Sequence, residues 1–149
     1  MSKVFPITPA STGALSVIGI ILIPLILIMG LVAYSARNTR FEVNDEGLRI
    51  KGAIYGRFIP KEFIIIEDSR ILNLNVEGEL KPIRRTNGIG LPGYSEGWFK
   101  LANGERALLF VTDRFNVVYI PTTEGYSVLL STVYPEEFLE SLNEEWNGY

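Results

Sequence analysis

Three basic residues lie close enough together in the sequence to hold an anion. Lys81, Arg84 and Arg85 fall within five residues, just before a glycine-rich segment. Guanidinium groups bind phosphate through paired hydrogen bonds, and glycine-rich backbone can add free amides. We therefore take these three as candidate ligand-binding residues for a phosphate or an anionic lipid headgroup. The alternative, which we favour from the sequence, is a solvated loop whose bases pair with nearby acids such as Glu77 and Glu79.

The glycine-rich segment itself has the spacing of the dinucleotide-binding fingerprint. It reads GIGLPG over residues 88–93. That fingerprint needs a preceding strand and a helix that begins within it, so that amides at the helix end reach the pyrophosphate. Here Pro92 interrupts the motif and a β-rich segment follows. We predict a bend at which the chain turns or closely approaches another strand, and no nucleotide cofactor.

The composition excludes most catalytic mechanisms. The chain has neither histidine nor cysteine, so it lacks the commonest general base, the thiol nucleophile and the commonest metal ligands. Glu105, Asp113 and Glu124 could work as an acid and base pair, but turn chemistry explains them equally well. We expect no catalytic residues, metal or cofactor, with an unrecognised hydrolase as the remaining catalytic alternative. The net charge of −3 argues against nucleic-acid binding.

The longest apolar stretch predicts that the chain is anchored in a membrane. Ala14–Tyr34 contains no charged residue, and thirteen of its residues are Leu, Ile or Val. As a helix it would be about 31 Å long, which matches the hydrocarbon core of a bilayer. We predict one transmembrane helix, kinked at Pro24. A buried helix of a soluble protein and a signal peptide cleaved near Ser35 are the alternatives.

Charges beside the span indicate its orientation. Arg37 and Arg40 follow it closely, whereas Lys3 is the one basic side chain before it. The excess of basic residues normally lies on the cytoplasmic side, so we expect the C-terminal part in the cytoplasm.

The rest of the chain is typical of one mainly β domain. We expect a tail over residues 1–13, a linker over 35–40 and a domain over 41–149. Short apolar runs divided by turn residues predict about seven strands, with an antiparallel meander over residues 97–131 that includes an Asn103-Gly104 turn. The strands expected before the meander are Phe41–Val43, Leu48–Lys51, Ile54–Ile59, Phe63–Ile66 (or a short helical turn) and Ile71–Val76.

An amphipathic helix is predicted after these strands. Pro135 suits the first position of a helix, and the acids that follow it complement the positive helix end. Phe138, Leu142 and Trp146 repeat at intervals of four and form one apolar stripe. We expect a helix over about 135–146, lying on the sheet or closing one end of a barrel.

Several short segments have turn and core patterns that recur in one family of domains. They are RTNG (85–88), LPGY (91–94), GWF (97–99), Ala107–Asp113, YIPT (119–122), LLS (129–131), Leu48–Ile50 and Ile54–Gly56. Over Phe41 to about Leu142 the chain resembles the bacterial pleckstrin-homology-like (PH) domain family. The resemblance implies two near-orthogonal antiparallel sheets, as a sandwich or partly open barrel, capped by a C-terminal helix. It supplies no catalytic residues. Related domains elsewhere bind phosphoinositides through a basic first hairpin, but this hairpin turns through Asn-Asp-Glu-Gly, so we do not transfer that activity.

Together these features predict a non-catalytic, single-pass protein of a bacterial plasma membrane. The PH-like domain would act as an interaction or scaffolding module that binds a protein partner or forms a homo-oligomer. The alternative is a sensor of a ligand or anionic headgroup that uses the basic loop from Lys81 to Arg85. Binding of the soluble domain to anionic liposomes would distinguish the two.

Overall fold

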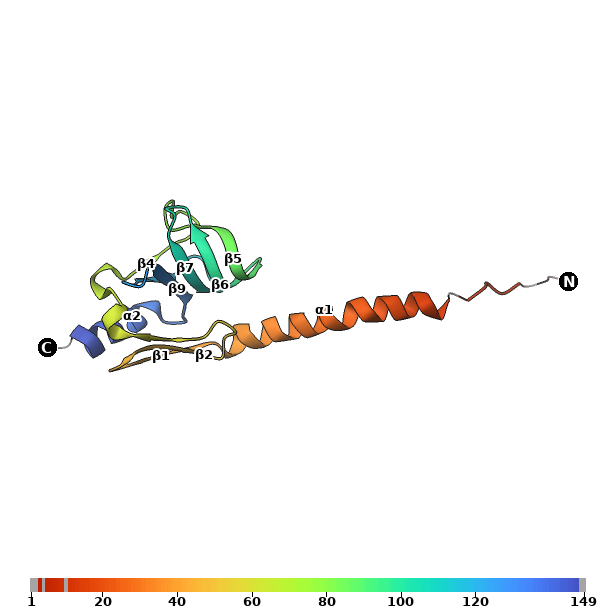
Figure 1. The fold of residues 1–149 in the computed structure, drawn as a ribbon, viewed down its shortest axis with the longest axis horizontal. Helices are drawn as coiled ribbons and strands as arrows, with labels where there is room; N and C mark the ends of the chain where they lie inside the picture. The colour runs from red at the N-terminus through yellow and green to blue at the C-terminus, as the bar shows by residue number, and fades with distance from the viewer. Residues whose placement is uncertain (1–2, 4, 10, 148–149) are drawn as a thin grey trace. The chain divides into compact units, whose positions relative to one another are not determined.

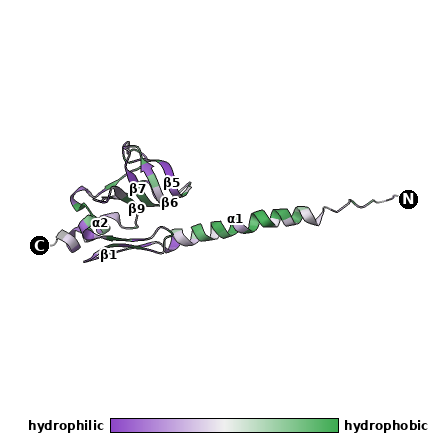
Figure 2. Cartoon of the chain, viewed as in Figure 1, coloured by the Kyte–Doolittle hydropathy of each residue, from purple (hydrophilic) through white to green (hydrophobic). Residues whose placement is uncertain are grey.

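A computed structural model describes residues 3, 5–9 and 11–147 and divides the chain into two units, Met1–Tyr34 and Ser35–Tyr149. Helix α1 (Thr12–Asn38) forms most of the first unit and ends in the second. The most apolar part of this helix is not buried against the rest of the described protein. In Figure 2 most of α1 is coloured green, which marks hydrophobic residues. The predicted apolar helix is confirmed, and its length and composition suit a membrane span.

The helix is longer than the predicted span. Residues 35–38 form its last turn, where we expected a linker. The Thr39 amide donates to the Ser35 carbonyl over 3.1 Å, and the Thr39 hydroxyl donates to the same oxygen over 2.7 Å. Since no proline or glycine interrupts this segment, the helical hydrogen bonds continue to the first strand.

Two sheets make up the second unit, which Figure 1 shows with the C-terminal helix α2 (Pro135–Asn147). The smaller sheet has the order β1-β2-β3, and the larger has the order β4-β8-β9-β7-β6-β5. The mainly β fold is therefore confirmed, with a C-terminal helix as expected. The strands are β1 (Arg40–Asn44), β2 (Gly47–Lys51), β3 (Phe58–Pro60), β4 (Arg70–Leu72), β5 (Pro82–Leu91), β6 (Tyr94–Leu101), β7 (Arg106–Val111), β8 (Val117–Pro121) and β9 (Tyr126–Ser131).

The segment between the first hairpin and β4 is less regular than we predicted. Of the strand predicted over Ile54–Ile59, only the last two residues are extended, as part of β3. The apolar run Phe63–Ile66 is not a strand. Two short 3-10 turns, η1 (Lys61–Phe63) and η2 (Ile66–Asp68), replace it, which agrees with the helical-turn alternative. A single bridge, Ile64 to Thr122, joins this run to the larger sheet. Burial of individual side chains, rather than strand pairing, accounts for its apolar character.

Two features of the larger sheet contradict the predictions. Arg84 and Arg85 of the basic loop, and the glycine-rich segment as far as Leu91, belong to β5, a ten-residue edge strand paired with β6. In addition, β9 lies between β8 and β7 and pairs with β7 in parallel, so the meander is not antiparallel throughout. The central strands β7, β8 and β9 are apolar on both faces, and such runs carry no signal of which strands are neighbours.

Both faces of the larger sheet are covered by apolar side chains. One face packs against the smaller sheet and α2, with fully buried residues such as Leu48, Leu108 and Leu142. The opposite face is covered by a second cluster that includes Leu74 and Leu80, from the loop before β5. The helical stripe is confirmed, since α2 buries Leu142 completely and the Trp146 indole donates to the Asn44 carbonyl over 2.6 Å.

Candidate functional site

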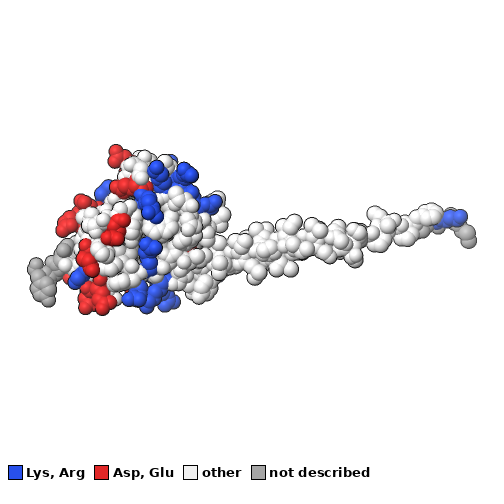
Figure 3. Space-filling view, viewed as in Figure 1, with Lys and Arg blue, Asp and Glu red and all other residues white. Residues whose placement is uncertain are grey.

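A row of three basic side chains crosses neighbouring strands of the larger sheet. Arg84 on β5 lies directly opposite Lys100 on β6, which lies directly opposite Arg106 on β7. Residues opposite one another in an antiparallel pair project from the same face, with Cβ atoms about 4.5–5.5 Å apart. All three side chains are exposed. Figure 3 shows basic residues gathered over the part of the domain that contains β5 and β6.

The three charges are not neutralised by their surroundings. Among the described residues, the only ion pair joins Lys51 to Glu42 over 2.7 Å. Like charges directly opposite on adjacent strands destabilise a sheet by a few tenths of a kcal/mol to about 1 kcal/mol. The arrangement therefore opposes folding slightly, while it concentrates positive charge where a negatively charged group could approach from solvent.

Aromatic rings extend this row at one side. The Arg106 guanidinium lies 4.8 Å from the centroid of the Trp98 ring, and Arg57 lies 5.0 Å from the same ring. Tyr126 meets Trp98 edge to face, with 5.1 Å between ring centroids. Cation–π contacts hold guanidinium groups against a ring while leaving N–H edges free to bond. We call Arg57, Arg84, Lys100 and Arg106 the basic surface.

The candidate residues from the sequence are divided by the fold. Arg84 joins the basic surface, whereas Arg85 lies opposite Phe99 and therefore projects from the other face of the sheet. Lys81 is exposed and lies just before β5, where its carbonyl accepts the Ala102 amide over 2.9 Å. The three bases do not form the single cluster that their sequence spacing suggests, because alternate residues of a strand point in opposite directions.

Sequence reasoning missed Arg57, Lys100 and Arg106. One signal for two of them was present, since Asn103-Gly104 marks a tight turn between β6 and β7. That turn pairs Lys100 with Arg106 in the hairpin register. No local pattern connects Arg57 to this surface, because its contacts with Trp98 and Tyr126 come from the packing of one sheet on the other.

The edge of β5 is poorly suited to pairing with another strand. Pro82 begins the strand, and its register against β6 shifts twice, around Ile83 and Thr86. Proline, bulges and charged side chains are the features that natural sheets use to prevent edge-to-edge association. The face that carries the basic surface is thus a better candidate for binding than the open edge beside it.

The glycine-rich segment has a purely structural explanation. A Cβ atom on Gly88 would lie 2.3 Å from the Glu96 carbonyl oxygen, so the chain approaches β6 too closely for a side chain. Gly93 has φ +73° in the turn between β5 and β6. The predicted bend and close approach are both present, and no helix begins within the motif.

Beside this turn, a buried carboxylate organises the hydrogen bonds of the domain. Glu96 is 1% exposed. It accepts hydrogen bonds from the Ser35 hydroxyl over 2.6 Å, from the Tyr55 amide over 3.0 Å and from the Tyr94 hydroxyl. Burial, followed by the bond to Glu96, raises the pKa of Tyr94 to about 12. The adjacent cavity of about 60 Å³ has room for no more than a few water molecules, so we assign this cluster a structural role.

The two packed sheets with a C-terminal helix define a PH-like module. Residues 39–145 match the family model described as bacterial PH domain, and the chain belongs to that family. The resemblance seen in the sequence is therefore confirmed. No curated protein and no solved structure gives a significant match.

Proposed function

We propose that this protein is a membrane-anchored binding module without catalytic activity, and that its basic surface holds an anionic lipid headgroup. The observation that carries this proposal is the register that sets Arg84, Lys100 and Arg106 directly opposite one another. Repulsion between these side chains lowers the stability of the fold. Among the described residues none of the three forms an ion pair, so an external anion is the group that would offset the repulsion.

Chain connectivity favours a ligand at the membrane. Helix α1 ends at Asn38 and β1 begins at Arg40, which leaves a single residue between them. If α1 crosses the bilayer, the domain begins within a few residues of the span. Its anionic ligand would then be available at the same membrane surface, where basic residues gain about 1 kcal/mol each from anionic lipid.

The chemistry of the surface suits binding rather than reaction. Because arginine stays protonated in proteins, it neither gives nor takes a proton at neutral pH. Its five N–H donors suit it to binding an anion. Trp98 orients two of the guanidinium groups instead of supplying a reactive atom. The row of unneutralised bases and the short connection to α1 together favour a headgroup over a protein partner or self-association, which the sequence alone had favoured.

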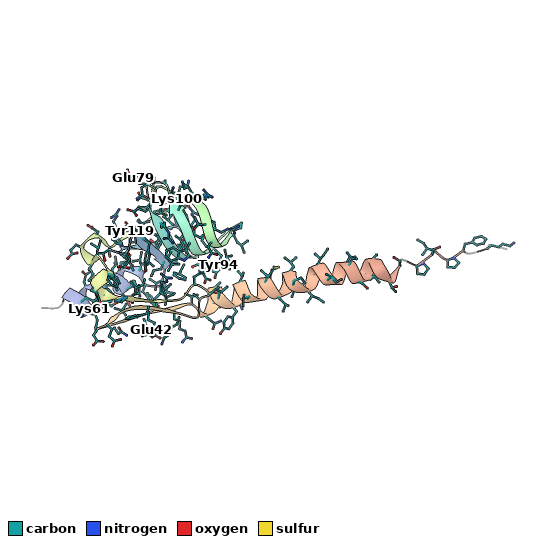
Figure 4. The ribbon with its side chains drawn as sticks, in the orientation of Figure 1. Glu42, Lys61, Glu79, Tyr94, Lys100 and Tyr119 are labelled. Carbon is teal, nitrogen blue, oxygen red and sulfur yellow. The ribbon has the colours of Figure 1, made fainter. Side chains whose placement is uncertain are left out.

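The experiment is flotation of the Ser35–Tyr149 domain with vesicles, comparing zwitterionic vesicles with vesicles that contain anionic lipid. Arg84→Ala and Lys100→Ala should each weaken binding to the anionic vesicles by about 1 kcal/mol, roughly fivefold. Lys61→Ala is the matched control, since Lys61 is an exposed base on η1, away from Lys100 (Figure 4). Added salt should release the wild-type domain.

Absence of salt-sensitive flotation would contradict the proposal, as would an equal loss of binding in Lys61→Ala. Crosslinking of the full chain in cells to a defined acidic protein through Lys100, with no lipid binding, would restore the protein-partner hypothesis. The cytoplasmic location of the domain is a separate part of the proposal. Protection of a C-terminal tag from protease in intact spheroplasts would support it, and cleavage there would contradict it.

A further inference from the structure

A second candidate site lies on the larger sheet, beside the turn between β8 and β9. It is a pocket of about 370 Å³, which is within the range of small-molecule sites. Arg70, Glu105, Tyr119 and Ser127 line it, together with Asp68 and the β8–β9 turn. Tyr119 and Ser127 are only 6% and 3% exposed, so polar atoms lie at the base of a depression rather than on a flat surface.

The fold places the four polar side chains in a diagonal line across adjacent strands. Arg70 on β4 pairs with Tyr119 on β8. Ser127 on β9 pairs with Pro121, two residues after Tyr119. Glu105 immediately precedes β7, the strand beside β9. Because these residues come from four neighbouring elements of one sheet, their arrangement is fixed by backbone pairing.

The hydrogen bonds within this line are long. The hydroxyl of Tyr119 lies 3.4 Å from Oε2 of Glu105, and the hydroxyl of Ser127 lies 3.3 Å from the same oxygen. The two hydroxyls are 3.2 Å apart. Hydroxyl bonds in proteins are typically about 2.7–2.8 Å, so these groups are held apart and keep capacity for a further partner. Glu105 is exposed and can accept additional donors.

Opposite charges lie at the two ends of the line. The Arg70 guanidinium sits over the Tyr119 ring, 5.0 Å from its centroid, while Glu105 lies at the hydroxyl end of the same side chain. The Arg70 side chain is exposed, and its guanidinium donates one long hydrogen bond, of 3.4 Å, to the Asp68 carbonyl. A positive end and a negative end are thus separated by the width of one aromatic side chain.

We propose that this pocket binds a short molecule with an ammonium group at one end and a carboxylate at the other, as in an unblocked dipeptide. The ammonium group would bond to Glu105 and the hydroxyls of Tyr119 and Ser127, and the carboxylate would bond to Arg70. A free α-amino acid carries its two charges on one carbon and cannot span the ring. Burial raises the pKa of Tyr119, which keeps its hydroxyl protonated for hydrogen bonding at neutral pH.

The test is a ligand-observed NMR titration of the full chain in detergent micelles. The probes are alanyl-alanine, its N-acetylated form, its C-terminal amide, and free alanine. We expect saturable binding of alanyl-alanine, and at least tenfold weaker binding of the three others. No saturable binding of alanyl-alanine, or equal binding of a capped form or of free alanine, would overturn the proposal.

Variants then locate the site. Glu105→Gln should weaken binding of the dipeptide by about tenfold, which corresponds to about 1.4 kcal/mol. Glu124→Gln is the matched control, because Glu124 is an exposed acid in the β8–β9 turn that does not line the pocket. Ser127→Ala provides a second variant should Glu105→Gln fail to fold, and it should weaken binding severalfold. Unchanged affinity in folded Glu105→Gln or Ser127→Ala would assign the ligand to another place. None of these measurements depends on lipid binding by the basic surface.

Discussion

Removal of the Tyr94 hydroxyl tests the importance of the buried carboxylate. Tyr94→Phe deletes one of the three donors to Glu96 and leaves the bonds from Ser35 and the Tyr55 amide. Hydrogen bonds to charged groups contribute about 1.5–3 kcal/mol, and Glu96 is almost fully buried. We therefore expect Tyr94→Phe to lower the free energy of unfolding by about 1.5–3 kcal/mol.

The assay is urea unfolding of the full chain in mild detergent, followed by tryptophan fluorescence. Both tryptophans, Trp98 and Trp146, lie in the Ser35–Tyr149 unit, so the signal reports on the domain and not on α1. Tyr55→Phe is the matched control. Its hydroxyl donates to the Asn87 side chain over 2.9 Å at an exposed position, so its loss should cost no more than about 1 kcal/mol.

The same substitution predicts a pH dependence. The folded-state pKa of Tyr94 is about 12, above the ordinary value of 10.0, so the folded protein holds this proton more tightly than the unfolded chain. The raised pKa of Tyr94 adds to the free energy of unfolding. This stabilisation is complete below pH 10 and is lost as the pH rises from 10 to about 12. In that window wild type should lose stability more steeply than Tyr94→Phe. Parallel pH profiles, or equal destabilisation by Tyr94→Phe and Tyr55→Phe, would refute the role assigned to Glu96.

Three further substitutions, with Gly78→Ala as a control, test the packing and the basic surface. Leu142→Ala should cost about 2–5 kcal/mol in the same unfolding assay, because this side chain is fully buried where α2 meets the core. Gly97→Ala should prevent folding or reduce thermal stability sharply. Gly97 has φ +110°, and a Cβ atom there would lie 2.6 Å from the Asn87 carbonyl oxygen. Gly78→Ala should be close to neutral, because the space around Gly78 is open. Lys100→Glu should raise stability by up to about 1 kcal/mol by pairing with Arg84 and Arg106, while it reduces flotation with anionic vesicles.

The sequence predicted the elements whose signals are local. The apolar helix, the Asn44–Gly47 hairpin turn and the stripe on α2 each follow from periodicity or turn chemistry within a few residues. The Oδ1 atom of Asn44 accepts hydrogen bonds from the amides of Glu46 and Gly47, each over 3.0 Å, as asparagine side chains often do in turns. Features with local causes were therefore recovered from the sequence with little ambiguity.

Features that depend on long-range packing were missed. Strand β5 was taken for a loop because proline, glycine and charged residues are unfavourable in strands, yet an edge strand tolerates them. The parallel pairing of β7 with β9 was also missed, since strands buried on both faces give no alternation. The binding candidates changed for the same reason: once β5 is a strand, Arg84 and Arg85 must lie on opposite faces.

Lys100→Glu separates two explanations of the basic row, because they predict different combinations of effects. If the row were an incidental feature of the surface, the substitution would raise stability by the same amount, because repulsion between like charges does not depend on function, and it would leave binding to anionic vesicles unchanged. If selection keeps the row for binding, replacing the central charge should stabilise the isolated domain and impair its binding together. Opposite signs in stability and binding are the expected mark of a surface that is retained for function at some cost in folding. If Lys100→Glu binds anionic vesicles as well as wild type, the row is not retained for lipid binding, whatever the stability of the variant.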